Sequence, residues 1–313
     1  MSDYKQSCVI LDKPSGISSN KALAKVKKKI SQKKAGFSGT LDPLASGLLI
    51  IFFNKATKLC SYFLDADKTY EAVARLGETS TTGDLDGDII STKDVPDLQK
   101  LNIEMLEKKY TGIVKQTPPM YSALKYKGIR LYKYAREGIN IERPSREIKI
   151  YSIKINIIDS NHLSIKVKCS KGTYIRTLVE QIGEEIGCGA LVSKLVRTSI
   201  NDINLSKSVS LEDFLISSER DICERYIING DLLLNKVNSC YLSKSNKYQI
   251  LQGNKVKIDS NPSELVRIYD EDKKFIGIGE INEELELLPK KILVWNLGLF
   301  EQYNVIECAL KLK

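Results

Sequence analysis

The sequence predicts a protein of mixed helices and strands, with one large domain followed by a small β-rich domain. Residues 48–53, LLIIFF, form an unbroken apolar run of strand length, which is typical of a strand buried on both faces. Residues 69–76, TYEAVARL, and residues 162–169, HLSIKVKC, alternate apolar and polar side chains as half-buried strands do. From about residue 238 the pattern changes to short strands separated by turn residues, which predicts a small β-barrel.

Helical signals lie between these strands. Residues 7–11 predict a short strand, and Ser18 or Ser19 can cap a helix over about 20–32. Residues 95–115 predict a helix followed by a strand. The large domain should therefore alternate between the two kinds of element.

A further helix is predicted after the turn SKG. Thr173 can cap it, and Gly187 or Gly189 can end it. Arg176 lies in its first turn, where a cation opposes the helix dipole. A charge in this locally unfavourable position indicates either a functional group or an ordinary surface arginine. The apolar stripe of the helix consists of Ile175, Leu178, Val179, Ile182 and Ile186.

Length and charge limit the possible functions. At 313 residues the chain has room for one large and one small domain. Hydrophobic residues make up 42% and charged residues 28% of the chain, which excludes a long disordered protein. The formal net charge of +9 favours a polyanionic partner, most simply nucleic acid. A lysine-rich surface that serves only solubility explains the charge equally well.

Cysteine and histidine usage argues against metal and disulfide chemistry. The seven cysteines are scattered and never form a C-x-x-C pair, which favours reduced thiols in a cytoplasm. The single histidine, His162, leaves little room for a transition-metal centre or a Ser-His pair. The start MSDYKQ lacks the apolar core of a signal peptide, and no apolar run reaches bilayer length. We therefore expect a cytoplasmic protein without a metal, a cofactor or a membrane anchor.

One acidic residue stands in an unusual setting. Asp42 precedes Pro43, which pushes its backbone into an extended conformation, and Gly39 and Gly47 allow sharp bends on either side. The apolar run 48–53 follows directly. A single carboxylate is thus held on a stiff loop at the edge of a core strand, as a reactive group would be. Asp-Pro is also a common turn starter, so spacing alone leaves the ordinary turn as the alternative.

Basic residues and tyrosines alternate in the block 118–138. Such a combination suits RNA, because aromatic rings stack on exposed bases and cations contact phosphates. The alternative is an amphipathic helix over GIRLYKYAREG (128–138), with its tyrosines facing the core. A second basic run lies within residues 21–34 and leads to the loop of Asp42, which makes phosphate contact by Lys33 and Lys34 a reasonable hypothesis.

Four stretches resemble, in the same order, the motifs of the TruB family of tRNA pseudouridine synthases. They are LDKPSGISSN (11–20), GTLDPLASGLL (39–49), PPMYSALKYKGIRLYKYAREG (118–138) and SKGTYIRTLVEQIGEEIGCGALVSKLVRT (170–198). The resemblance implies an α+β pseudouridine-synthase fold, with a mixed, largely antiparallel sheet and flanking helices. The short C-terminal strands resemble the PUA RNA-binding module.

The resemblance also implies a domain organisation. Residues 1–236 would form the catalytic domain, with an RNA-binding insertion near 118–145. Residues 237–296 would form the PUA-like domain, a small β-barrel. Residues 297–313 remain an unassigned tail.

The implied activity is isomerisation of a uridine in the TΨC loop of tRNA, at position 55, to pseudouridine. Asp42 would be the essential carboxylate, Arg176 its partner, and Tyr70 would stack on the flipped base. Tyr174 and Leu195 would line the pocket, with Phe37 at its entrance. The implied RNA contacts are Lys33, Lys34, Lys125, Lys127, Arg130 and Arg197.

The family implies a monomer that binds the T arm and needs no metal or cofactor. The chain departs from the family pattern at Phe37, where GFSG replaces the usual GHTG. The alternative function is a tRNA-binding chaperone with weak or no turnover, which the basic and aromatic residues support equally well. A same-family enzyme that acts on another RNA is the second alternative.

Overall fold

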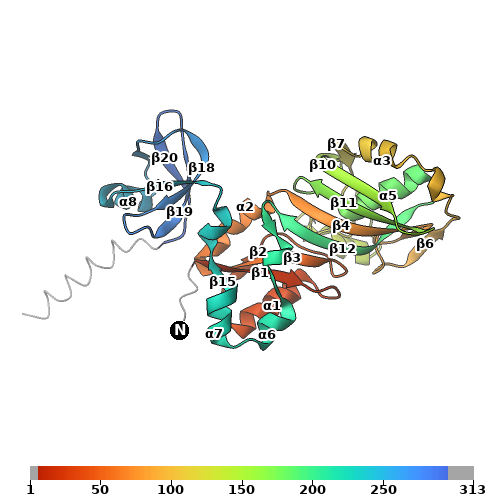
Figure 1. The fold of residues 1–313 in the computed structure, drawn as a ribbon, viewed down its shortest axis with the longest axis horizontal. Coiled ribbons are helices and arrows are strands. Elements are labelled where there is room, and N and C mark those ends of the chain that lie inside the picture. The colour runs from red at the N-terminus through yellow and green to blue at the C-terminus, as the bar shows by residue number, and fades with distance from the viewer. Residues whose placement is uncertain (1–5, 295–313) are drawn as a thin grey trace, which may run out of the picture. The chain divides into compact units, whose positions relative to one another are not determined.

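The computed structural model describes residues 6–294 and divides the chain into two compact units, each described here by itself (Figure 1). The larger unit consists of residues 9–51 and 60–226. The smaller unit combines residues 6–8, 52–59 and 227–294. The predicted tail 297–313 lies outside the described residues.

A mixed sheet forms the centre of the larger unit. Its strand order is β14-β1-β3-β12-β4-β11-β10-β7, and the central pairings β12/β4, β4/β11, β11/β10 and β10/β7 are antiparallel. The pairings β1/β14 and β3/β12 are parallel. This confirms the predicted mixed, largely antiparallel sheet. The strands are β1 (Ser7–Lys13), β3 (Ser46–Phe53), β4 (Lys68–Leu76), β7 (Gly112–Gln116), β10 (Arg146–Ile157), β11 (His162–Cys169), β12 (Ala190–Ile200) and β14 (Val209–Ser210), with β2 (Ala35–Phe37) on β3 and β13 (Ile203–Asn204) on β12.

The core of this unit lies between the sheet and two helices, α3 (Ile103–Lys109) and α5 (Ile175–Ile186) (Figure 1). The alternating apolar residues of β4 and β11 face the stripe of α5, as their period predicts. Residues 47–53 of β3 are fully buried, which confirms the prediction from LLIIFF. The other helical segments of the larger unit are α1 (Ser19–Lys29), α2 (Cys60–Leu64), η2 (Leu98–Lys100), α4 (Leu131–Arg136), η3 (Leu205–Lys207), α6 (Leu211–Ile216), α7 (Glu219–Asp221) and the π-helical turn η4 (Ile222–Tyr226), whereas η1 (Asn54–Leu59) belongs to the smaller unit.

Helix ends follow the sequence signals in part. Ser18 caps α1, because its side chain accepts a hydrogen bond from the Lys21 amide, and Gly187 ends α5 in a left-handed conformation with φ +98°. The prediction that Thr173 caps α5 is wrong. The helix starts two residues later, and the Thr173 hydroxyl instead donates to the Ser170 carbonyl within the preceding turn.

Two small hairpins lie in the larger unit. β5 (Glu78–Ser80) pairs with β6 (Ile89–Thr92), and β8 (Lys125–Tyr126) pairs with β9 (Ile129–Arg130). The helix over 128–138, which was the alternative interpretation of that block, is present only in part, as α4 (Leu131–Arg136). Lys127 and Gly128 both have positive φ, +49° and +84°, as a two-residue hairpin turn requires.

The smaller unit contains a curled five-stranded sheet, which corresponds to the predicted barrel-like module. Its order is β16-β18-β19-β20-β17, and its core includes Val266, Ile268 and Ile276. Helix α8 (Lys244–Leu251), which the sequence did not predict, packs against the same core through Ile250. The strands are β16 (Asn238–Tyr241), β17 (Val256–Lys257), β18 (Ser263–Tyr269), β19 (Phe275–Ile281) and β20 (Glu286–Ile292), preceded by β15 (Ile227–Asn229) and η5 (Gly230–Leu234).

Gly47 offers a test of how closely β3 and β12 approach. It has φ +101°, and a Cβ atom there would lie 2.4 Å from the backbone oxygen of Arg197. Gly47→Ala should therefore lower the free energy of unfolding by at least about 3 kcal/mol. Gly138→Ala, where φ is +72° and the space is open, is the matched control and should cost only about 1 kcal/mol of backbone strain. Urea unfolding measures both, and equal losses would contradict the close approach.

Candidate active site

The loop that carries Asp42 connects β2 to β3 and is held by the turn before α1. The Leu41 amide donates to the Ser19 hydroxyl at 2.8 Å, and that hydroxyl donates to the Leu41 carbonyl at 3.0 Å. The Gly16 amide donates to the Pro43 carbonyl at 2.8 Å. Both residues that flank Asp42 are thus tied to one turn, so the carboxylate is presented on a fixed backbone.

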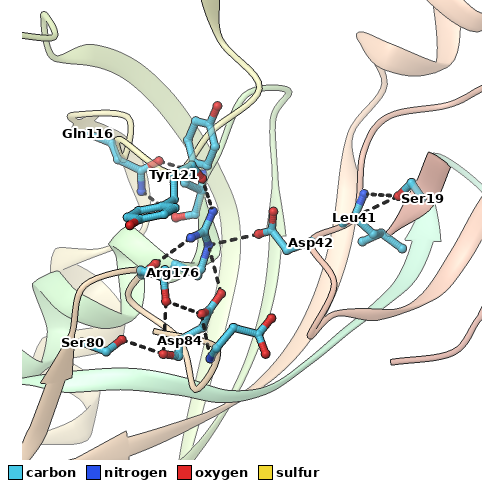
Figure 2. A network of polar contacts seen from close by, with 11 residues as sticks. Ser19, Leu41, Asp42, Ser80, Asp84, Gln116, Tyr121 and Arg176 are labelled. Carbon is cyan, nitrogen blue, oxygen red and sulfur yellow. Dashed lines mark hydrogen bonds and ion pairs between the residues drawn. The ribbon is translucent and has the colours of Figure 1, made fainter. Parts of the chain in front are cut away.

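Arg176 occupies the second position of α5 and points at Asp42 (Figure 2). Its Nε lies 3.0 Å from Asp42 Oδ2 and 3.7 Å from Asp84 Oδ2. Its two terminal nitrogens donate to the carbonyls of Thr82 and Tyr121, at 2.6 and 2.7 Å. The Arg176 side chain is only 5% exposed. The guanidinium is therefore locked between two carboxylates and two backbone segments, not exposed at the surface.

Asp84 is the residue of the site that sequence reasoning missed. It is 3% exposed in the loop between β5 and β6, where the Ser80 hydroxyl donates to its carbonyl at 2.6 Å. Its own Oδ1 accepts from the Thr82 hydroxyl and from the Asp86 amide. Asp84 lies in the polar stretch GETSTTGDLDGD (77–88). Nothing in its pattern separates Asp84 from the exposed Asp86 and Asp88.

Gly83 allows this loop to approach α5. Its φ is +74°, and a Cβ atom there would lie 2.6 Å from Oε1 of Glu180, one helical turn beyond Arg176. Burial raises the pKa of Glu180 to about 7, and the Arg176 charge opposes this shift. Near neutral pH a large share of Glu180 is therefore uncharged.

The Asp42 carboxyl has a pKa raised above its ordinary value. Burial is the largest cause, and the nearby charges of Asp84 and Asp86 add to it. Arg176 is the main opposing charge, with a smaller contribution from Lys13. The charge of Arg176 thus favours the ionised form of Asp42, but burial has the larger effect on the pKa. A carboxylate of raised pKa is a stronger base and nucleophile than an ordinary one.

Tyr70 and Leu195 belong to the apolar cluster that also contains Leu41 and Ala45, next to Asp42. Tyr70 lies on β4, opposite Arg197 of β12. Burial raises the pKa of the Tyr70 hydroxyl, whereas the charge of Arg197 opposes the shift. The hydroxyl therefore stays protonated at neutral pH.

The other two predicted pocket residues, Tyr174 and Phe37, lie at the ends of a helix and a strand. Tyr174 directly precedes α5, and its backbone is bonded on both sides by the Gln116 side chain, at 2.7 and 3.0 Å. The Arg146 guanidinium lies over its ring, 5.2 Å from the centroid. Phe37 is the last residue of β2 and is half-buried.

The prediction that Arg197 contacts RNA is wrong for this structure. Its side chain is 1% exposed, and its nitrogens donate to the carbonyls of Leu48 and Gly39, at 2.8 and 3.1 Å. The other predicted RNA contacts are exposed, and none of them forms an ion pair with any residue between 6 and 294. They are Lys33, Lys34, Lys125, Lys127 and Arg130.

Residues 6–294 contain no group of three or more His, Cys, Asp and Glu side chains that could hold a metal ion. No helix in the same part of the chain is long and apolar enough to cross a membrane.

Family models match most of the chain. Residues 27–175 match the model of the TruB family pseudouridylate synthase N-terminal domain. Residues 176–227 match that of the tRNA pseudouridylate synthase B C-terminal domain, and residues 239–293 match that of pseudouridine synthase II TruB, C-terminal.

Relatives in other organisms agree over nearly the full length. A protein of Nitrosococcus oceani named tRNA pseudouridine synthase B is 41% identical over 93% of this chain and 95% of its own. One of the same name from Pseudomonas putida is 40% identical over 91% and 94%. A solved Cbf5–Nop10–Gar1 complex contains a chain of the same fold, with a TM-score of 0.70 and 24% identity over 94% of this chain and 86% of that one. The chain therefore belongs to the TruB family of pseudouridine synthases.

Proposed function

We propose that the protein converts uridine 55 in the TΨC loop of tRNA to pseudouridine, with Asp42 as the essential carboxylate. The observation that carries this proposal is the 3.0 Å contact between Asp42 and the buried Arg176, in a chain that belongs to this family. Relatives that share about two fifths of the sequence are named tRNA pseudouridine synthase B, which supports tRNA as the substrate.

The reaction rearranges one glycosidic bond. The bond between C1′ and N1 of uridine breaks, the base turns, and a bond forms between C1′ and C5. C5 then loses its proton and N1 gains one, so the product is an isomer of the substrate. Asp42 acts either as a nucleophile or as a base at C2′, and its raised pKa suits both roles.

The surrounding residues orient the carboxylate and the base. Arg176 fixes the direction of the Asp42 carboxylate. Its charge also favours the ionised form of Asp42 and so opposes the effect of burial. Tyr70 and Leu195 offer an aromatic ring and an aliphatic side chain beside the loop of Asp42. A uridine in folded RNA must leave its stack to reach these groups, so we infer base flipping.

RNA contact is assigned to exposed cations outside the pocket. Lys125, Lys127 and Arg130 lie on the β8/β9 hairpin and are free to meet phosphates of the T arm. Lys127 also lies over the Tyr126 ring, 5.4 Å from its centroid. Lys33 and Lys34 lie just before β2 and would extend this contact. The PUA-like domain, residues 237–296, would add a further RNA-binding surface.

We also propose that the protein is a monomer and acts in the cytoplasm. The six cysteines between residues 6 and 294 are free thiols, which suits a reducing compartment. A tRNA chaperone without turnover would use the same exposed cations. The Asp42–Arg176 pair favours the enzyme, because binding alone does not need a carboxylate of raised pKa in contact with a buried arginine.

Asp42→Ala should abolish pseudouridine formation and leave tRNA affinity within a few-fold of the wild type, because affinity comes mainly from phosphate and stacking contacts. Single-turnover assays and filter binding measure the two effects. Asp88→Ala, which removes an exposed acid from the neighbouring loop, is the control and should retain activity. Product formation by Asp42→Ala would rule out the assigned role.

The acid limb of the pH–rate profile should lie above the ordinary aspartate value of 3.8, because the active form is ionised and the pKa of Asp42 is raised. Asp86 contributes to this rise by its charge. Asp86→Asn should therefore move the limb to lower pH, whereas Asp88→Asn should leave it in place. A shift to higher pH in Asp86→Asn would contradict this electrostatic account.

Phe37→His should be tolerated and Phe37→Ala should weaken tRNA binding, because the position supplies a flat ring for stacking. A lost base–aromatic contact costs on the order of 1–3 kcal/mol of binding free energy. Binding and single-turnover assays on both variants test this. An inactive wild type that gains turnover in Phe37→His would instead show that an imidazole is required.

A further inference from the structure

Arg197 brackets the segment that carries Asp42. Its Nε donates to the Leu48 carbonyl at 2.8 Å and its Nη2 to the Gly39 carbonyl at 3.1 Å. These two carbonyls lie on opposite sides of Asp42 in the chain. One guanidinium on β12 therefore joins the start of the loop to the strand that follows it.

The backbone of Arg197 contacts the same segment, at Gly47. It pairs with Gly47 in the parallel ladder of β3 and β12, and a Cβ atom on Gly47 would lie 2.4 Å from the Arg197 oxygen. Side chain and backbone of one residue thus contact three points of the segment from Gly39 to Leu48. The segment has little freedom to shift relative to β12.

The same residue lies directly opposite Tyr70. Arg197 pairs with Tyr70 in the antiparallel ladder of β12 and β4, so the two residues lie side by side on neighbouring strands. The loop of Asp42 and the ring of Tyr70 come from separate elements. Arg197 is the residue that both of them contact.

The charge of Arg197 is costly where it stands. Its side chain is 1% exposed, and it makes no ion pair with any residue in the described range 6–294. Its charge also contributes to lowering the pKa values of two buried neighbours, Lys13 and Lys68, to about 8 in each case. A neutral amide could bond one carbonyl without this repulsion. The planar guanidinium bonds two carbonyls at once.

We propose that Arg197 is a positioning residue, which sets the spacing between the Asp42 carboxylate and the Tyr70 ring. The role rests on the proposed function, because it matters only if both groups act on the same nucleotide. Displacing a reacting group by about 1 Å can reduce a rate about 100-fold. Loss of the bracket should therefore affect the chemical step and spare tRNA affinity.

The test compares Arg197→Gln and Arg197→Lys with Arg267→Lys. Arg267 is the matched control, since its nitrogens also donate to two backbone carbonyls, those of Val237 and Asn235, in the smaller unit. The single-turnover rate at saturating enzyme should fall about 100-fold in Arg197→Gln and about 10-fold in Arg197→Lys. The dissociation constant for tRNA should stay within about threefold, and Arg267→Lys should retain the wild-type rate.

Hydrogen exchange separates positioning from general stability and does not depend on activity. Amides of residues 39–48 should exchange faster in both Arg197 variants, while those of α5 and β11 keep wild-type rates. A wild-type single-turnover rate in Arg197→Gln would overturn the proposal. So would faster exchange throughout the larger unit, or equal losses of rate and affinity. If Asp42→Ala retains turnover, the proposed function fails, and the exchange pattern still decides whether Arg197 fixes the loop.

Discussion

The proposed active site depends on one buried guanidinium that contacts carboxylates from two separate loops. Arg176 contacts Asp42 from the β2–β3 loop and Asp84 from the β5–β6 loop, and its terminal nitrogens donate to backbone carbonyls. A buried arginine without these partners would be strongly destabilising. Burial of Arg176 therefore requires both loops to bring their carboxylates next to it. The same contact orients the Asp42 carboxylate.

Buried cations also stiffen the backbone around this pair. Lys13 is fully buried and donates to the carbonyls of Pro14 and Ile17, and Lys68 donates to three carbonyls between residues 63 and 66. Arg197 does the same on either side of Asp42. Each cation donates to at least two backbone carbonyls and so ties together residues of a turn or loop. Rigid loops of this kind suit a site whose geometry must exist before the substrate arrives.

Most of the fold could be predicted from the sequence where the pattern is regular. The apolar run of β3, the alternation of β4 and β11 and the stripe of α5 lie where their periods place them. β10 was missed, although it is 12 residues long. A bulge between Ile150 and Ser152 breaks its alternation, so Ile150 and Ile153 face the same core without a period of two.

The sequence singled out two residues of the site, Asp42 and Arg176, but not Asp84. Asp42 and Arg176 stand out locally, one before a proline and the other at a helix start, and the structure brings them into contact. Asp84 has no such mark, because its burial comes from contacts with Thr82 and Arg176 that are set only by tertiary packing. Arg197 looked like a surface cation for the same reason. Sequence pattern reports the charge of a side chain, whereas only the fold decides which carbonyls surround it.

The most direct measurement of this account is a carbon-13 NMR titration of the Asp42 carboxyl, assigned by comparison with Asp42→Asn. The account predicts a pKa above the ordinary 3.8 in the wild type, because burial outweighs Arg176. It predicts a further rise in Arg176→Gln, since the opposing positive charge is removed. A wild-type pKa at or below 3.8, or no change in Arg176→Gln, would contradict the claim that this ion pair controls the carboxylate.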